Sequence, residues 1–281
     1  MRRGKWLYIL IFFVLGTSLL ASAYKGLTFE EWLQVLNHGN TAEKRVALEA
    51  MGYLYEPQVE DLLLTYLKNE NRELRLSAVW SLGQIRSLLA LEPIVWMLGS
   101  DDDVRIDSAL INFGELAIPH LIVKLKLIGI MQDYEQGLRV SRIIIDINSP
   151  DGIVEVANFL TNLLTNEGYK SKATSMLSQI GEKAIAPLMV AFQKTYSDDV
   201  KINILNTLVT IGSEKALEVL YSQAESFNPA VRRTVANALG RIKAPGNLPY
   251  LIAFLRDTDE NVRMQAVIAL GELKDPGASL Y

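Results

Sequence analysis

A short segment recurs along this chain, and that repetition limits the possible fold more than any other feature of the sequence. AVRRTVANALGRIKAP at 230–245 matches NVRMQAVIALGELKDP at 261–276 almost position for position, and ELRLSAVWSLGQIRSL at 73–88 is a third copy. The glycine of this segment recurs, mostly 31 residues apart, at Gly52, Gly83, Gly114, Gly181, Gly212, Gly240 and Gly271. Such a period suits two short helices and two turns, so repeated helix pairs are predicted.

The apolar residues of the segment have the spacing of an α-helix. In VRMQAVIALGEL they fall at i, i+4, i+7, i+8 and i+11 from Val262, which places them on one helix face. Each intervening stretch holds a second apolar segment after a proline, a residue that suits the first turn of a helix. These prolines are Pro57, Pro93, Pro119, Pro187 and Pro249. The predicted fold class is all-α, an α-solenoid of antiparallel helix pairs with about eight repeats.

Three motifs carry a family resemblance: VRRTVANALGRI at 231–242, VRMQAVIALGEL at 262–273 and LRLSAVWSLGQI at 74–85. With them, the chain resembles HEAT-repeat proteins, particularly the short-repeat kind related to phycobilisome lyase subunits. The resemblance implies a single HEAT-like solenoid over residues 24–281. One repeat is degenerate, near 134–166, and there Asn148 stands where the glycine is expected.

The resemblance also implies a polar ladder between repeats, formed by loop acids or amides and the arginine after the valine. The matching residues are Arg75, Arg105, Arg232 and Arg263, with Lys201 as a substitute. A structural ladder is preferred over substrate-binding arginines. The polar loops before these helices supply helix N-caps, for which Asn71, Asp103, Asp199, Asn228 and Asp259 or Asn261 are the candidates.

A partner-binding surface is predicted on the helices of the repeated segment, which in HEAT families line the concave side. At 100° per residue, the positions three and seven before the glycine point away from the core. Many of them are apolar, as expected of a contact site. The predicted partner-binding residues are Leu76, Trp80, Ile111, Leu205, Val209, Met264 and Ile268. The alternative is that tight superhelical curvature buries these side chains against one another.

No pattern of catalytic, cofactor-binding or metal-binding residues stands out, so the protein is predicted not to be an enzyme and to need no cofactor. Cysteine is absent. His38 and His120 lack partners at metal-ligand spacing, and the His-Glu pairs of deoxyhypusine hydroxylase, an iron enzyme of this repeat class, do not occur. The acidic run 101–103 is a cation-site alternative to helix capping. Solvated faces and caps explain Glu30, Glu31, Glu272 and Asp275.

The N-terminus has the three parts of a secretory signal peptide: the basic MRRGK, the apolar run 6–15, and Ala21 and Ala23 in an A-x-A cleavage pattern. The alternative is a membrane anchor at 6–23, although about 27 Å of helix spans a bilayer only marginally. Both readings place the repeats outside the cytoplasm, in the periplasm or extracellular space. Without residues 1–23 the chain has 25 basic and 32 acidic residues, a net charge of −7. That balance disfavours nucleic-acid binding.

The sequence therefore predicts an exported, non-catalytic scaffold that binds a protein or peptide along the concave face. The alternative is a bilin-lyase-like or chaperone-like subunit acting on a pigment or protein, which the export signal disfavours because those relatives act on cytosolic pigment proteins. A homodimer through the C-terminal repeat is a further expectation, because one flank of the helix at 258–273 has no partner segment in the sequence.

Overall fold

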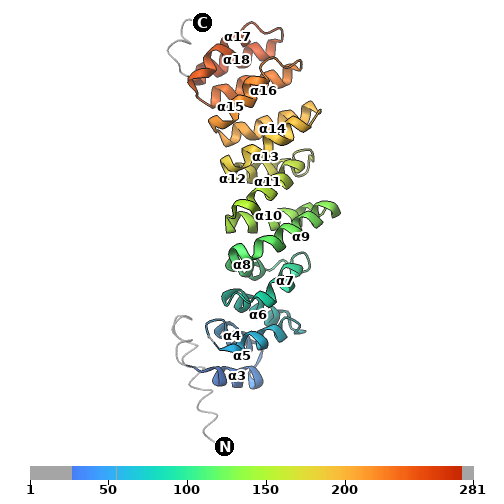
Figure 1. Ribbon diagram of the computed structural model, residues 1–281, viewed down its shortest axis with the longest axis vertical. Helices are drawn as coiled ribbons and strands as arrows, with labels where there is room; N and C mark the ends of the chain where they lie inside the picture. Colours follow the sequence, from blue (N-terminus) through green and yellow to red (C-terminus); the bar gives the residue numbers. More distant parts are fainter. Residues whose placement is uncertain (1–26, 55, 274–281) are drawn as a thin grey trace, which may run out of the picture. The chain divides into compact units, whose positions relative to one another are not determined.

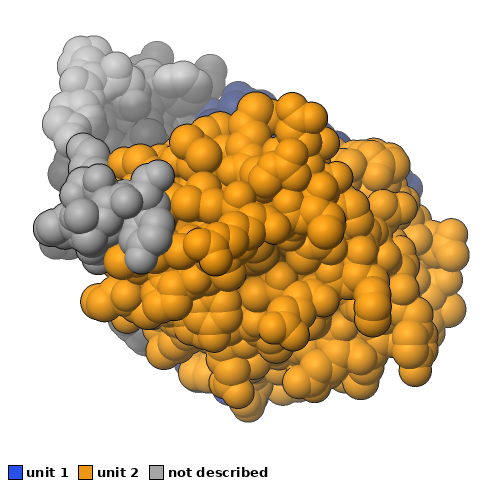
Figure 2. Space-filling view, turned by 90° about the horizontal axis from the view of Figure 1, so that it is seen from above, with its two compact units in different colours: residues 1–117 blue, residues 118–281 orange. Residues whose placement is uncertain are grey.

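The computed structural model describes residues 27–54 and 56–273, which form two compact units divided between Ala117 and Ile118 (Figures 1 and 2). The described residues are helical and contain no β-strand, which confirms the all-α class. No described helix is both long and apolar enough to cross a membrane. The predicted signal segment 1–23, with Ala21 and Ala23, lies outside the described residues. The prediction of one solenoid over 24–281 stays a prediction.

The first unit contains three helices that lie side by side in chain order, and further helices pack against them (Figure 1). The side-by-side helices, here called layer A, contact one another in the order α4, α6, α8. Helix α3 covers α4, while α5 and α7 form layer B against α6 and α8. The bounds are α3 Phe29–His38, α4 Thr41–Met51, α5 Pro57–Tyr66, α6 Arg72–Gln84, α7 Leu88–Met97, α8 Val104–Phe113 and η1 Gly114–Ala117.

The second unit repeats this arrangement with more helix pairs. Its layer A runs α10, α12, α14, α16, α18, and its layer B comprises α9, α11, α13, α15 and α17. The bounds are α9 Ile118–Met131, α10 Tyr134–Ile147, α11 Pro150–Leu163, α12 Lys170–Ile180, η2 Gly181–Ala184, α13 Ile185–Lys194, α14 Asp198–Ile211, η3 Glu214–Ala216, α15 Leu217–Ser222, α16 Pro229–Arg241, η4 Pro245–Asn247, α17 Leu248–Phe254 and α18 Glu260–Leu273.

The repeated glycine has two different physical roles. In α6, a Cβ added at Gly83 would lie 2.6 Å from the Cα of Ala109, and in α16 a Cβ at Gly240 would lie 2.6 Å from the Cα of Ala269. Here the missing side chain lets consecutive layer A helices touch. Gly114, Gly181 and Gly212 instead have φ of +59°, +67° and +71° and end their helices. Asn148 adopts φ +61° and ends α10 in the same way.

The structure corrects two local predictions. Pro93 does not begin a helix, because α7 starts at Leu88 and Pro93 lies exposed inside it. The N-cap of α14 is Ser197, which places Asp199 in the first turn. Gly39 follows α3 with an extended backbone, φ −73°. The caps at Asn71, Asp103 and Asn228 are confirmed, and Asp259 accepts hydrogen bonds from the amides of Asn261 and Val262.

Candidate protein-binding surface

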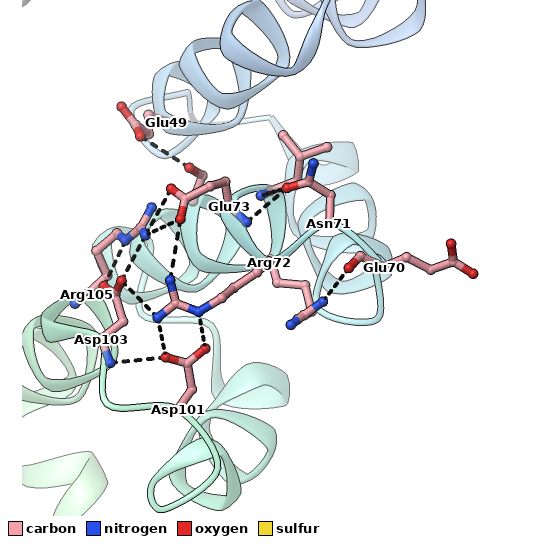
Figure 3. A network of polar contacts seen from close by, with 11 residues as sticks. Glu49, Glu70, Asn71, Arg72, Glu73, Asp101, Asp103 and Arg105 are labelled. Atoms are coloured by element: carbon pink, nitrogen blue, oxygen red, sulfur yellow. Dashed lines mark hydrogen bonds and ion pairs between the residues drawn. The ribbon is translucent and has the colours of Figure 1, made fainter.

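A network of arginines and carboxylates joins two consecutive repeats of the first unit (Figure 3). Arg72, at the start of α6, donates from Nε and Nη2 to the two oxygens of Asp101 at 2.9 and 2.6 Å. Arg105, in α8, donates from Nε to Asp103 at 2.9 Å and from Nη2 to Glu73 of the preceding repeat at 3.1 Å. These charge-assisted hydrogen bonds hold the loop before α8 and the start of α8 against the first turn of α6.

These contacts shift the ionisation of the loop carboxylates. The hydrogen bond from the Arg105 side chain lowers the pKa of Asp103 to about 2, and the hydrogen bond from Arg72 lowers the pKa of Asp101. Both carboxylates are thus held ionised by arginines of the repeat stack. The described residues contain no group of three or more acidic or histidine side chains that could hold a metal ion. We therefore interpret the acidic run 101–103 as a bridge between repeats.

The second unit has a similar ladder, in which one arginine–aspartate pair is joined by lysine and asparagine contacts. Arg232, in α16, donates from Nε and Nη2 to the two oxygens of Asp257 in the next repeat, each at 2.7 Å, and both side chains are largely buried. The hydrogen bond from Arg232 lowers the pKa of Asp257. Other repeat-to-repeat pairs are Lys172–Glu135, Lys183–Asn148, Lys215–Glu182 and Asn228–Asp198.

The predicted arginine ladder is therefore correct for two of its four members. Arg105 and Arg232 bridge repeats, whereas Arg75 and Arg263 each donate to carbonyl oxygens of the loop that precedes their own helix. The substitute Lys201 lies over the Phe192 ring, with Nζ 5.9 Å from its centre. Arg72 was missed because it precedes the valine-arginine position of the motif.

The structure divides the predicted partner-binding residues into two groups. Leu76, Leu205 and Val209 are buried, so the expectation that they form exposed apolar pads is wrong. Their helices, α6 and α14, have a layer A neighbour on both flanks, and these neighbours cover more than the core-facing side. Trp80 and Ile111 are partly buried, and Trp80 makes an edge contact with Tyr53 at 5.6 Å between ring centres.

The remaining two partner-binding residues, Met264 and Ile268, are exposed on α18, with 57% and 49% of their surface accessible. Val267 of the same helix is 61% exposed, although the residue four before the repeated glycine is fully buried in the other layer A helices that carry the glycine. Those residues are Leu48, Val79, Leu110, Leu177, Leu208 and Ala236. A Cβ at Gly271 would meet no described atom within 4 Å. No segment within residues 27–54 and 56–273 therefore covers the stacking face of α18.

Two exposed aromatic rings were missed by the sequence reasoning. Tyr196 and Phe227 each stand directly before an N-cap residue, Ser197 and Asn228 respectively, and their exposures are 98% and 103%. The signal was present, since the same position holds Glu70 and Asp102 in the first unit. The histidines show no comparable feature: His38 ends α3 and His120 lies in the first turn of α9, and each is exposed.

Stacked helix pairs with these ladders and surfaces define an α-solenoid repeat protein. The chain belongs to the HEAT-repeat family, whose model matches residues 29–113 and 217–279, together more than half of its length. Among curated proteins it is similar to uncharacterized phycocyanin operon protein Z of Pseudanabaena tenuis (strain PCC 7409). The two are 22% identical over 194 residues, which cover 69% of this chain and 84% of that relative.

Solved structures give the same fold. Kap121p bound to Nup53p matches with a TM-score of 0.61 at 12% identity, over 94% of this chain and 36% of that chain. The complex of CpcE and CpcF of phycocyanin lyase from Nostoc sp. PCC7120 matches over 90% of this chain and 80% of that chain, at 18% identity and a TM-score of 0.28. The first supports the solenoid architecture, and the second is too distant in shape to add to it.

Proposed function

We propose that this protein is a non-enzymatic scaffold that binds another protein or a peptide through the layer A helices. The observation that carries this proposal is the exposure of Met264 and Ile268 on α18. Neighbouring solvent-facing apolar side chains on one helix are typical of a contact surface. At the corresponding positions of other layer A helices, Trp80 and Ile111 are partly buried, and Leu76, Leu205 and Val209 are buried.

The electrostatics support a structural rather than a catalytic use of the charged groups. The carboxylates with lowered pKa values, Asp101, Asp103, Glu182 and Asp257, have an arginine or lysine partner in the neighbouring repeat. A carboxylate whose pKa is lowered by pairing has no proton to donate and is a weak general base near neutral pH. The acidic balance of the chain also argues against a nucleic-acid partner.

A comparative pull-down tests the surface. Wild type, Met264→Asp/Ile268→Asp and the control Val190→Asp, which alters a 47% exposed residue of α13, are used as bait in extract from the producing cells. The proposal expects one or more proteins retained by wild type and control and lost with the double variant. The same proteins on all three baits would refute binding at α18.

We further propose that the chain is exported, because residues 1–23 combine a basic start, an apolar run and the A-x-A pattern that ends at Ala23. Export with cleavage predicts a mature protein that begins at Tyr24 and is released with the periplasmic or extracellular fraction. Mass spectrometry of the fractionated protein checks this. An intact N-terminus in the cytosolic fraction would contradict export.

The open stacking face of α18 supports a second proposal about partners, in which a second copy of the chain covers it. Val267 and Gly271 of α18 correspond to Ala236 and Gly240 of α16. In α16 these two residues are buried, and Gly240 lies against α18. A second copy offers the same apolar face, as a two-fold contact requires. Light scattering should give a dimer for wild type and a monomer for Val267→Glu. A monomeric wild type would exclude this contact.

A role alongside a pigment protein is the second candidate function, and the curated relative supports it through its name, a phycocyanin operon protein. In that role the solenoid would hold a bilin-carrying protein or the bilin itself. Mixing the purified protein with phycocyanobilin distinguishes the candidates, because a bound bilin changes its absorbance spectrum. An unchanged spectrum, with and without phycocyanin, would remove this candidate.

A further inference from the structure

We propose that the loop edge formed by Tyr196, Phe227 and the neighbouring groove binds an extended, proline-containing polypeptide segment that carries lysine or arginine. The proposal rests on the protein-binding function above, but it concerns a different surface, within the second unit. It assigns a ligand class to residues that the layer A helices do not use.

Tyr196 and Phe227 are almost fully exposed, so neither ring is packed in the described part of the chain. An apolar residue before an N-cap often packs on the fourth residue of the helix, forming a hydrophobic staple. Here that fourth residue is a cation in both cases, Lys201 after Tyr196 and Arg232 after Phe227. Arg232 is turned to Asp257 and to the carbonyl oxygens of Ser226 and Phe227, and Lys201 lies over Phe192. Both rings therefore remain in solvent.

The loops that carry the rings are joined. Asn228, next to Phe227, donates from Nδ2 to the carboxylate of Asp198, two residues after Tyr196, at 2.9 Å. The rings thus lie one repeat apart on the same edge, and neighbouring helices pack about 8–10 Å from one another. A polyproline II segment repeats every three residues, or about 9 Å. A segment of this conformation therefore suits an edge on which the rings belong to consecutive repeats.

Phe227 also borders an open groove of about 990 Å³ between the α15–α16 and α17–α18 connections. Tyr221 and Tyr250 stack in its wall with ring centres 4.3 Å apart and planes 7° apart, and Pro229 adds an apolar surface. The Tyr221 hydroxyl donates to Asn247 Oδ1 at 2.7 Å, which fixes the pair. Rigid aromatic walls of this kind are suited to proline rings and to aliphatic side chains.

The charges along this edge favour a basic ligand. Arg232 and Asp257 neutralise each other, which leaves more acidic than basic groups around the rings and the groove. The acidic groups are Asp198, Asp199, Glu225, Asp259 and Glu260, and the basic groups are Lys194, Lys201, Arg256 and Arg263, which donates to the carbonyl oxygens of Asp257 and Thr258 in the groove wall. A lysine or arginine of the ligand can form ion pairs with the carboxylates and cation–π contacts with the exposed ring faces.

Selection from a random library of displayed dodecapeptides tests this assignment on the full chain. We expect enriched peptides to carry proline together with lysine or arginine. Their retention should fall at least tenfold on Tyr196→Ser/Phe227→Ser and stay unchanged on the control Met131→Ser, which alters a 77% exposed residue of α9. Because the rings touch solvent, the double variant should keep the wild-type melting temperature. Retention should also weaken for Asp199→Asn/Glu225→Gln.

Three results would overturn the proposal: no enrichment over an unrelated protein, enriched peptides without a basic residue, or equal retention on the double variant. Co-sedimentation with phosphatidylglycerol–phosphatidylcholine vesicles separates a lipid partner. Equal vesicle binding by wild type and the double variant supports the peptide assignment, and loss of vesicle binding in the double variant refutes it. Since Met264 and Ile268 stay intact in every variant, failure here leaves the pull-down test of the layer A surface unaffected.

Discussion

Replacing Gly240 with alanine should destabilise the protein, whereas the same replacement at Gly271 should stabilise it. The two glycines lie 31 residues apart in the same Ala-Leu-Gly motif, so the sequence gives them equal status. In the structure, a Cβ at Gly240 would lie 2.6 Å from the Cα and 2.7 Å from the Cβ of Ala269. Because one of these atoms belongs to the backbone, α16 and α18 would have to move apart. The equivalent Cβ at Gly271 meets nothing within 4 Å.

The magnitudes follow from two opposing effects. Alanine is favoured over glycine by about 0.8–1.0 kcal/mol inside a helix. Forcing an extra methyl into a packed contact costs about 1–3 kcal/mol. The net change is a loss of up to about 2 kcal/mol for Gly240→Ala and a gain of about 0.5–1 kcal/mol for Gly271→Ala. For a chain of this size, about 2–4 °C of melting temperature corresponds to each kcal/mol.

Thermal and urea unfolding followed by circular dichroism measure both variants, at two protein concentrations so that any contribution from self-association is visible. The midpoints should move in opposite directions from wild type. If both midpoints shift in the same direction, the close approach of α16 and α18 does not require a glycine at position 240. A Gly240→Ala variant as stable as Gly271→Ala would have the same meaning.

Three further predictions concern the ladder and the core. The folded pKa of Asp103, about 2, lies below its ordinary 3.8, so its ionised form stabilises the fold above about pH 4. Urea titrations should therefore show a wild-type advantage over Asp103→Asn near neutral pH that shrinks as the pH falls from about 4 toward 2. Arg232→Met should lower the free energy of unfolding by about 2 kcal/mol, since it leaves the largely buried Asp257 carboxylate unpaired; an unchanged urea midpoint would contradict the bridge. Leu76→Asp should cost at least about 3 kcal/mol, while Ile268→Asp should change the melting temperature by no more than about 2 °C; equal losses would refute the assigned burial.

The repeat could be predicted from the sequence because each layer A helix must present matching residues to its neighbours. The exact contact could not: Gly240 meets Ala269, two residues before Gly271, whereas Gly83 meets Ala109, five residues before Gly114. The helix caps were predictable for a local reason, since an N-cap side chain bonds to amides two or three residues away. That is why Asn71, Asp103 and Asn228 were identified correctly.

The burial of Leu76, Leu205 and Val209 could not be predicted from one helical wheel. A wheel separates a core-facing side from the opposite side, as if each helix had one neighbouring surface. Inside a layer, a helix such as α6 or α14 is contacted by layer A helices on both flanks and by layer B behind, so a wider arc is covered. In α18 one flank has no described neighbour, and Met264 and Ile268 keep the exposure that the wheel predicts.

The two roles of the repeated glycine explain why equal motifs connect differently to the next helix. After Gly114 and Gly181, the positive φ ends the helix and a 3-10 turn leads directly into the following helix. In α6 and α16 the helix continues past its glycine. There the absence of a side chain at Gly83 and Gly240 makes room for the neighbouring repeat. A side chain at Gly114 would be strained by its own backbone, whereas one at Gly83 would collide with another helix. The sequence motif contains the glycine in both cases. Only the structure, with the neighbouring repeat, distinguishes the glycine that ends a helix from the glycine that makes room for another helix.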